Sequence, residues 1–322
     1  MAKISLLVCS RVSGNKNFGL FNLLDSLKNM SASYENFEVL VKFDSGDRKV
    51  RRVVRKLTDY PFTIKHITEP RGRGYRDLHV FYNRLFTLVD EQSIVVGAVA
   101  DDFEIIQQNW DEIILSNTKV FSDGIYVIHG RPHPPYQRTN YETHKFFLDY
   151  DIDRSEDLEI IDEAPLWSRK LLSICGGLGL LSFTDLWTLM LEYFLYHRCG
   201  LERTIFLEHP YVQRVLNERI DKHVGLRWTN DRANNFAFTR TVSYKTIVEY
   251  QALNIFSHIK LEELALVPPP IVPRKFDIEI PEIVPPPLSD RLKRIALNAV
   301  PASLEPRIKR LYSIITRRKP ES

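Results

Sequence analysis

Two kinds of hydrophobic pattern take turns along the first hundred residues: continuous apolar runs, and apolar residues spaced as on one face of a helix. Continuous apolar runs predict strands that are buried on both faces, whereas apolar positions at helical spacing predict amphipathic helices. The predicted strands are 4–10, 37–43, 62–67 and 94–100, and the predicted helices are 21–30, 50–57 and 75–89. Strands and helices in this order favour an α/β fold, with a mostly parallel, Rossmann-like sheet flanked by helices. Ligands of such sheets bind at the carboxyl ends of the strands.

Proline content separates a folded body from a C-terminal part. Eight of the 18 prolines fall within residues 268–287. Proline fixes φ and lacks a backbone donor, so this stretch predicts an extended spacer or a strap along the surface. We therefore expect a body over residues 1–265, a Pro-rich linker over 266–288 and a short helical tail over 289–322.

Charge and cysteine content narrow the class of protein. The chain carries 44 basic and 41 acidic residues, and nine of the basic but only three of the acidic ones lie in 288–322. The body is therefore mildly acidic, which disfavours a nucleic-acid-coating protein, because that class needs a basic face on its folded domain.

The three cysteines are far apart, which excludes a CxxC zinc site and favours a reducing compartment. No signal peptide or membrane-spanning run is evident, so we expect a cytoplasmic protein.

Two adjacent carboxylates, Asp101 and Asp102, directly follow the fourth predicted strand. Neighbouring carboxylates repel one another unless water solvates them or a cation bridges them. Such oxygen ligands suit Mg²⁺ or Mn²⁺, which add phosphate oxygens and waters. A solvent-exposed acidic turn is the alternative.

Other strand ends carry candidate anion and nucleoside ligands. Arg71 and Arg73, in the sequence Arg-Gly-Arg-Gly after the third strand, could hold a pyrophosphate or form a basic surface loop. Asp44, at the end of the second strand, could accept hydrogen bonds from a base or ribose, or cap its own turn. The sequence has neither a P-loop nor a GxGxxG motif after the first strand, which weakens a nicotinamide-cofactor interpretation.

The order of these motifs resembles glycosyltransferase family 2, which has the GT-A fold. The resemblance rests on 4–11, on 37–47 (FEVLVKFDSGD) and on 94–103 (IVVGAVADDF) with Trp110-Asp111 beyond. It implies a nucleotide-sugar-binding half over 1–115, an acceptor half over 116–265, a UDP- or GDP-sugar donor and a Mn²⁺ or Mg²⁺ cofactor. It also implies nucleotide contacts from the loop after the first strand and from an acid ending the second. The residues concerned are Ser10, Arg11 and Asp44, with Asp47 a poorer match than Asp44.

The same resemblance assigns the paired carboxylates to the family's DxD position. Ala100 stands where the first aspartate of that motif would be, so Asp102 is the expected metal ligand and Asp101 the expected donor-site residue. Some enzymes of the GT-A fold add a histidine ligand, for which His209 and His223 are candidates. Either histidine could equally be an ordinary polar or core residue.

A weaker part of the resemblance concerns the acceptor side. An apolar helix from 168 leads to Gly176-Gly177, which matches the family's acceptor loop, and Asp185 then lines up with its catalytic base. Asp185 could instead cap the following helix, and Glu208 is the reserve candidate for the base. The stretch 129–167, rich in proline, histidine and aromatic residues, could be an acceptor-side loop or a packed surface excursion.

These observations favour a metal-assisted, inverting glycosyltransferase acting on a hydroxyl acceptor, either a glycan or a lipid-linked glycan. The alternatives are a sugar-nucleotide nucleotidyltransferase and a non-catalytic adaptor that binds a nucleotide or a sugar. The tail 289–322 combines an apolar helix face with basic residues, which is typical of peripheral contact with an anionic membrane. The alternative interpretation is that the tail is disordered or packs on the body.

Overall fold

The computed structural model describes residues 3–10, 19–72, 77–130, 164–179, 184–215 and 242–263. The predicted linker and tail lie outside these ranges. The first part of the chain forms β1 (Ile4–Ser10), α1 (Leu20–Met30), β2 (Phe37–Asp44), α2 (Val50–Leu57), β3 (Thr63–Glu69), α3 (Leu78–Phe86) and β4 (Val95–Ala98). Each of these elements overlaps the one predicted from the apolar pattern, and the largest differences in bounds, two to three residues, are at β3, β4 and α3.

Shorter strands and longer helices follow in the second part. They are β5 (Phe103–Ile105), α4 (Trp110–Asn117), β6 (Val127–His129), β7 (Leu166–Ser168), α6 (Arg169–Cys175), α7 (Thr184–Cys199), β8 (Thr204–Phe206), β9 (Val212–Arg214) and α9 (Val242–Glu263). A three-residue strand is too short to show alternation, which is why the sequence pattern did not predict β5 to β9.

The main sheet has seven strands in the order β3-β2-β1-β4-β7-β6-β8. Strands β3, β2, β1 and β4 are parallel to one another. Strand β7 is antiparallel to both β4 and β6, and β8 is parallel to β6. The mostly parallel sheet expected from the sequence is therefore confirmed, with β7 as the one reversed strand. A separate pair, β5 with β9, is antiparallel.

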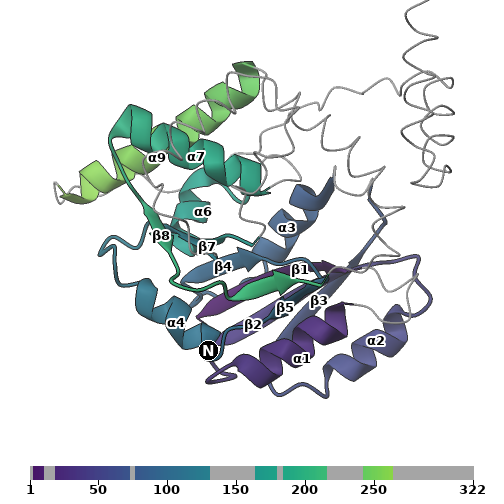
Figure 1. Ribbon diagram of the computed structural model, residues 1–322. Coiled ribbons are helices and arrows are strands. Elements are labelled where there is room, and N and C mark those ends of the chain that lie inside the picture. The colour runs from purple at the N-terminus through teal and green to yellow at the C-terminus, as the bar shows by residue number, and fades with distance from the viewer. Residues whose placement is uncertain are drawn as a thin grey trace, which may run out of the picture. The chain divides into compact units, whose positions relative to one another are not determined.

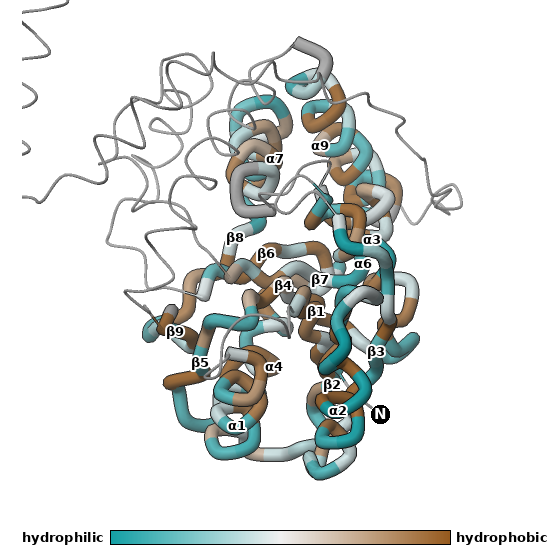
Figure 2. The backbone as a smooth tube through the Cα atoms, turned by 90° about the vertical axis from the view of Figure 1, so that its right-hand side faces the viewer, coloured by the Kyte–Doolittle hydropathy of each residue, from teal (hydrophilic) through white to brown (hydrophobic). Residues whose placement is uncertain are grey.

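Helices cover both faces of this sheet (Figure 1). Helices α1 and α2 lie on one face, while α3 lies on the other, with α6, α7 and α9 beyond it on the same side. This arrangement follows from the strand order, because right-handed crossovers from β1 to β2 to β3 keep two helices on one side and the return to β4 uses the other. Figure 2 shows apolar strands between helices in which polar and apolar turns alternate.

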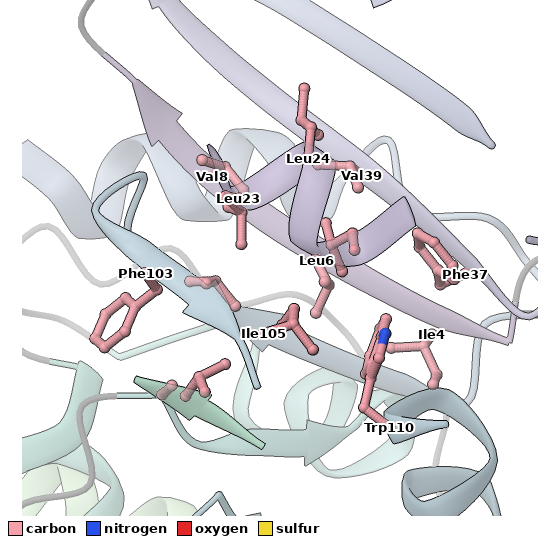
Figure 3. Close-up of a cluster of buried hydrophobic side chains, with 14 of the residues drawn as sticks. Ile4, Leu6, Val8, Leu23, Leu24, Phe37, Val39, Phe103, Ile105 and Trp110 are labelled. Carbon is pink, nitrogen blue, oxygen red and sulfur yellow. The ribbon is translucent and has the colours of Figure 1, made fainter. Parts of the chain in front are cut away.

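The core beneath α1 is built from side chains of β1, β2, β5, α1 and the start of α4 (Figure 3). Ile4, Leu6 and Val8 point from β1 towards Leu23 and Leu24 of α1, and all five side chains are buried. Phe37, Val39, Phe103, Ile105 and Trp110 extend the same cluster. Side chains of α1, β1, β2, β5 and α4 thus form one cluster, which fixes the turn before β5 relative to β1.

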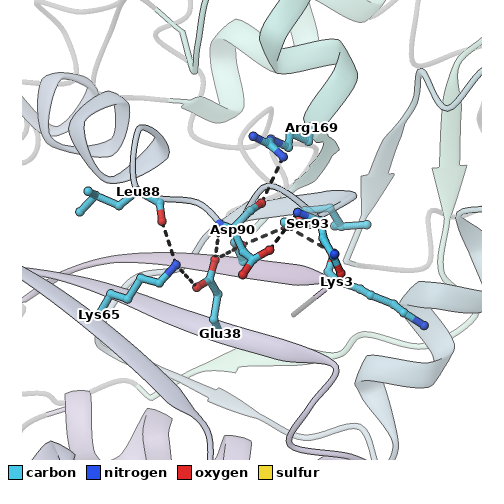
Figure 4. Close-up of polar contacts among 10 residues, drawn as sticks. Lys3, Glu38, Lys65, Leu88, Asp90, Ser93 and Arg169 are labelled. Atoms are coloured by element: carbon cyan, nitrogen blue, oxygen red, sulfur yellow. Dashed lines mark hydrogen bonds and ion pairs between the residues drawn. The ribbon is translucent and has the colours of Figure 1, made fainter. Parts of the chain in front are cut away.

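A polar network lies at the amino-terminal end of the parallel strands (Figure 4). Buried Glu38 accepts hydrogen bonds from Ser5 Oγ (2.6 Å) and from the Asp90 backbone N–H (2.8 Å), and its other oxygen lies 2.8 Å from Lys65 Nζ. Arg169 Nη1 donates to the carbonyl of Asp90 at 3.1 Å. The network ties β1, β2 and β3 to the loop before β4 and to the start of α6.

Over the ranges that the structure describes, none of the helices has the length and apolar composition needed to span a bilayer.

Candidate functional site

The carboxyl edge of the sheet gathers some of the polar residues named from the sequence. Strands β1, β2 and β4 all end there, and two reversals through β7 give β6 and β8 the same direction as β4. Ser10, Asp44, His129 and Phe206 are the last residues of β1, β2, β6 and β8. They therefore lie along one edge, where parallel sheets bind ligands.

Ser10 and Asp101 are in direct contact at this edge. The hydroxyl of Ser10, which is 4% exposed, donates a hydrogen bond to Asp101 Oδ2 at 2.7 Å. Asp101 and Asp102 form the half-buried turn between β4 and β5. The carbonyl of Asp102 accepts a hydrogen bond from the N–H of Val215 at 2.8 Å, so the segment after β9 holds this turn from the other side.

Gly19 lets the start of α1 come against the same turn. A Cβ atom at residue 19 would lie 1.7 Å from the carbonyl oxygen of Asp101, a distance that no side chain can occupy. Glycine is therefore required here by the close approach of two backbones. The positive, N-terminal end of the α1 dipole consequently lies beside the two carboxylates.

Asp44 is held by a lysine of its own strand. Lys42 Nζ forms an ion pair with Asp44 Oδ1, and both side chains are buried. Lys42 Nζ also lies 3.8 Å from the ring centroid of Phe81 on α3, which is cation–π geometry. Lys42 was not predicted as a site residue from the sequence, although a lysine two residues before an aspartate in an otherwise apolar strand lies on the same face as that aspartate.

Cys9 lies between these charged groups. Burial raises the pKa of its thiol, Lys42 opposes that rise, and Asp101 and Asp44 add to it. Asp44 ends β2 and Asp101 follows β4, and these two strands flank β1, so the two carboxylates belong to the strand ends on either side of β1.

Asp47 contributes a further acceptor in the turn after β2. Its Oδ1 accepts a hydrogen bond from the Lys49 N–H at 3.0 Å, so it caps the turn that leads into α2. Its Oδ2 is buried and has no hydrogen-bond partner within the described part of the chain. An unsatisfied buried acceptor is costly, and a ligand hydroxyl or N–H would satisfy it.

The paired carboxylates fit a hard divalent cation whose remaining ligands come from elsewhere. Within the described residues there is no group of three or more His, Cys, Asp or Glu side chains that could hold a metal ion. Mg²⁺ commonly binds through one or two carboxylates plus substrate phosphates and waters, so two adjacent aspartates are sufficient protein ligands. The donor set is therefore suited to a cation that arrives with a phosphate-bearing ligand.

Several residues named from the sequence are not brought into this cluster. Arg71 is exposed after β3, and Arg11, Arg73 and His223 lie outside the described residues. Asp185 is in the first turn of α7, where a helix was expected, but its side chain is not among those described.

Glu208 and His209 stand in the turn after β8. Their side chains are 91% and 69% exposed, and the closest approach between them is 4.0 Å. A carboxylate this exposed keeps its hydration, which makes Glu208 a less favourable general base than a residue in a partly closed site.

A buried His–Glu pair at the same edge was not found by the sequence analysis. His129 Nε2 lies 3.0 and 3.1 Å from the two carboxylate oxygens of Glu192 on α7. Thr204 Oγ1 donates to Glu192 at 2.6 Å, and the His129 ring stacks on Phe206 at 5.1 Å. The pair joins β6 and β8 to α7, the helix that begins with the candidate base. Its two members are 63 residues apart, which hides them from any local motif.

The glycine loop after α6 is held by an asparagine of α3. Asn83 Nδ2 donates to the carbonyl of Leu178, and Asn83 Oδ1 accepts from the N–H of Leu178, both at 2.8 Å. Gly177 has φ of +130°, and a Cβ there would lie 2.3 Å from Asn83 Oδ1. Helix α3, within residues 1–115, thus fixes the backbone of the loop that the resemblance implies for the acceptor.

Comparison with known proteins bears on the fold. No protein-family model matches the sequence, and no curated protein matches it. The chain is similar to the mannosyltransferase PcManGT from Pyrobaculum calidifontis in complex with GDP-Man and Mn²⁺. The TM-score is 0.51 and the identity 12%, and the match covers 82% of this chain and 75% of that one.

Two further matches have lower TM-scores. S. aureus TarS 1-349 in complex with UDP-GlcNAc matches with a TM-score of 0.42 and 16% identity, over 79% of this chain and 80% of that one. A 4-diphosphocytidyl-2C-methyl-D-erythritol synthase from Anaerococcus prevotii matches with a TM-score of 0.42 and 11% identity, over 70% and 96%.

The strand order, the helical layers and the mannosyltransferase match together define the class of fold. The chain has the GT-A fold, as the resemblance implied.

Proposed function

We propose that the protein is a glycosyltransferase that moves a sugar from a UDP- or GDP-sugar to a hydroxyl group of a glycan or lipid-linked glycan. The contact between Ser10 and Asp101 at the carboxyl edge of a GT-A sheet carries this proposal. Asp44 at the neighbouring strand end supports it. The similar mannosyltransferase is described as a complex with GDP-Man and Mn²⁺, which agrees with such a donor.

We propose that Asp102, together with Asp101, binds the diphosphate of the donor through Mn²⁺ or Mg²⁺. When bound, such a cation would neutralise the negative charge that develops on the leaving diphosphate. The Ser10 hydroxyl keeps Asp101 Oδ2 in one orientation, and the α1 N-terminus adds positive potential. Arg11, Arg71 and Arg73 are proposed to contact the diphosphate.

Asp44 and Asp47 are the proposed nucleoside ligands. Lys42 occupies Asp44 Oδ1 and fixes the carboxylate, so hydrogen bonds to a base or ribose would come to a preoriented acceptor. The buried Oδ2 of Asp47 offers a second acceptor in the same turn.

Asp185 is proposed to accept the proton of the acceptor hydroxyl as that oxygen attacks the anomeric carbon. Attack from the face opposite the leaving diphosphate inverts the configuration. A carboxylate is basic enough, because the hydroxyl becomes acidic late in the displacement.

Calorimetry of UDP and GDP binding, with and without Mn²⁺, tests the donor site. We expect binding of one nucleotide to require Mn²⁺, to be lost in Asp102→Ala and to persist in the control Glu112→Ala, which removes an exposed carboxylate on α4. Asp102→Ala should also abolish sugar transfer. Absence of binding of both nucleotides under all conditions would contradict the donor site.

The base assignment has its own test in single-turnover transfer. Asp185→Asn should lower turnover greatly while the donor affinity stays unchanged. If Glu208→Gln has that effect instead, the base is Glu208. Donor binding without turnover in the unmodified chain would indicate an adaptor, and release of pyrophosphate from a nucleoside triphosphate would indicate a nucleotidyltransferase.

The tail 289–322 is proposed to bring a cytoplasmic enzyme to the inner face of a membrane. Its basic residues and apolar helix face are suited to anionic lipid. Flotation with liposomes should be weaker for a chain ending at residue 287 than for the full chain, and equal flotation would remove this part of the proposal.

A further inference from the structure

Six exposed basic side chains cluster in α2 and the two residues before it. No acidic residue occurs within residues 48–57. We refer to the six as the α2 basic face: Arg48, Lys49, Arg51, Arg52, Arg55 and Lys56.

The opposite side of α2 is what attaches it to the protein. Val50, Val53 and Leu57 are buried in the core beneath the sheet. Because these positions repeat at helical spacing, the basic side chains are left on the outer side of the helix. Figure 2 shows this helix in alternating polar and apolar turns at the edge of the molecule's described part. No large hydrophobic side chain within 48–57 is exposed.

None of the six charges is neutralised by a carboxylate of the described residues. Other basic residues of the fold do have acidic partners, such as Arg203 with Asp123 at 2.7 Å and Arg198 with Glu249 at 2.9 Å. Among the charged side-chain ends of the α2 basic face, the contact found with the described residues is a cation–π contact of Lys56 with Phe21 at 5.5 Å.

The arrangement opposes the stability of its own helix. Arg51 and Arg52 are four residues before Arg55 and Lys56 respectively, and like charges at this spacing repel one another. The first turn of α2 contains no acidic residue, so Arg51 and Arg52 also face the positive end of the helix dipole. Arg55 and Lys56, in the last turn, do suit the helix dipole, and Lys56 also contacts Phe21. The repulsion at four-residue spacing and the two arginines of the first turn are not offset by a carboxylate of the described residues, which favours an anionic partner.

We propose that the α2 basic face binds the surface of a membrane that contains anionic phospholipids. Clusters of four to eight basic residues on an amphipathic helix suit such surfaces, and their attraction is additive over the charges. The face has one sign of charge and no exposed aromatic ring, so it offers charge but no stacking platform for a sugar or a base. The rest of the body is mildly acidic, so the attraction to anionic lipid is concentrated at the α2 basic face.

This contact would orient the candidate site. Arg48 and Lys49 follow Asp44 by only four and five residues, so the basic face begins at the carboxyl edge of the sheet. Docking through the first turn of α2 would therefore bring this end of the helix, which is the end nearer to that edge, to the lipid head groups. This inference does not depend on glycosyl transfer, although it suits an enzyme with a lipid-linked acceptor.

Co-sedimentation of the full chain with vesicles tests the inference. The vesicles are phosphatidylcholine alone or with phosphatidylglycerol, and the test variant is Arg51→Gln/Arg52→Gln/Arg55→Gln. Removal of three charges should weaken partitioning to the anionic vesicles on the order of 100-fold. The control Lys3→Gln/Lys119→Gln/Lys260→Gln, which removes three exposed charges outside α2, should bind as the unmodified chain does.

Two additional measurements separate a binding role from a structural one. Arg51→Lys/Arg52→Lys/Arg55→Lys keeps the charge and should retain binding, and the glutamine variant should unfold at no lower a temperature than the unmodified chain. Equal vesicle binding by the glutamine and control variants would overturn the proposal. So would α2-dependent binding of soluble polyphosphate by a chain that does not bind anionic vesicles, because the partner would then be a soluble polyanion.

Discussion

Lys42 and Asp44 are a charged pair inside a strand whose other residues are mostly apolar. Their side chains belong to residues that are 3% and 8% exposed. A buried ion pair contributes little net stability, but removal of one partner leaves a buried charge uncompensated. Replacement of one partner alone should therefore lower the free energy of unfolding far more than replacement of both.

Lys42→Met should lower the free energy of unfolding by about 3 kcal/mol, because Asp44 loses its partner in a buried place. Urea denaturation followed by circular dichroism measures this change. The double variant Lys42→Met/Asp44→Leu should recover most of the loss, since it replaces both charges with apolar groups of similar size. The double variant should still fail to bind UDP or GDP if Asp44 contacts the nucleoside. A Lys42→Met protein as stable as the unmodified chain would contradict this view of the pair.

At the residue scale, the sequence predicted the acidic strand ends but not their partners. Asp44, Asp101 and Asp102 were found because each directly follows an apolar strand. Lys42, His129 and Glu192 were missed, since a buried charge is recognised only when its partner is known, and the partner of His129 is 63 residues away. Gly19 was missed for a similar reason, as its requirement comes from the backbone of Asp101.

At the scale of elements, α3 is the helix that joins the two parts of the proposed site. Through Phe81 it contacts Lys42, on the proposed nucleotide side, and through Asn83 it holds the backbone of Leu178, in the loop proposed for the acceptor. The two contacts are made by different side chains of α3. Replacement of Asn83 should therefore change the loop at Leu178 without changing the contact between Phe81 and Lys42.

Asn83→Ala should lower the free energy of unfolding by about 2 kcal/mol, because it removes two hydrogen bonds worth about 1 kcal/mol each. It should also raise the KM for the acceptor, since the loop from Gly176 loses its support, while nucleotide affinity stays unchanged. Steady-state kinetics with calorimetry checks both parts. Asn83→Asp keeps the size but cannot donate to the Leu178 carbonyl, so an intermediate effect is expected.

Asn117→Ala is a matched control for this prediction. Asn117 also donates from Nδ2 at 2.8 Å, but to the carbonyl of Ile113 within its own helix. Its replacement should leave the acceptor KM unchanged. If Asn83→Ala changes stability alone, with acceptor and donor kinetics as in the unmodified chain, then Asn83 is a structural residue only.

The elements themselves were predictable where they are long and strongly patterned. The run ISLLVCS gave β1 its observed bounds, and the amphipathic spacing in 50–57 did the same for α2. Strands β6, β7 and β8 have three residues each and are defined by their place in the sheet. Their pairing depends on tertiary contacts such as Trp167 Nε1 to Thr188 Oγ1 at 3.0 Å, which a local pattern does not contain.

At the scale of the whole molecule, the two halves of the described body share one sheet. Strand β7 lies between β4 and β6, and α6 begins at the next residue. Gln251 of α9 accepts a hydrogen bond from Trp187 of α7 and donates one to the Cys175 carbonyl at the end of α6. Since a buried network and a shared sheet connect the halves, we expect them to unfold in one cooperative transition.

Thiol labelling can test this cooperativity, because Cys9 is in β1 and Cys175 is in α6. Burial raises the pKa of both thiols, and the thiolate is the reactive form, so alkylation of the folded chain at neutral pH should be slow. In the Cys199→Ser variant, which removes the half-buried third thiol, Cys9 and Cys175 should become reactive at the same urea concentration. Peptide mass spectrometry of samples alkylated along a urea series resolves the two sites. Labelling of Cys175 at clearly lower urea than Cys9 would show that α6, α7 and α9 separate from the sheet first. In that case these three helices would form an independently unfolding unit, and the buried contacts of Gln251 would stabilise it only locally.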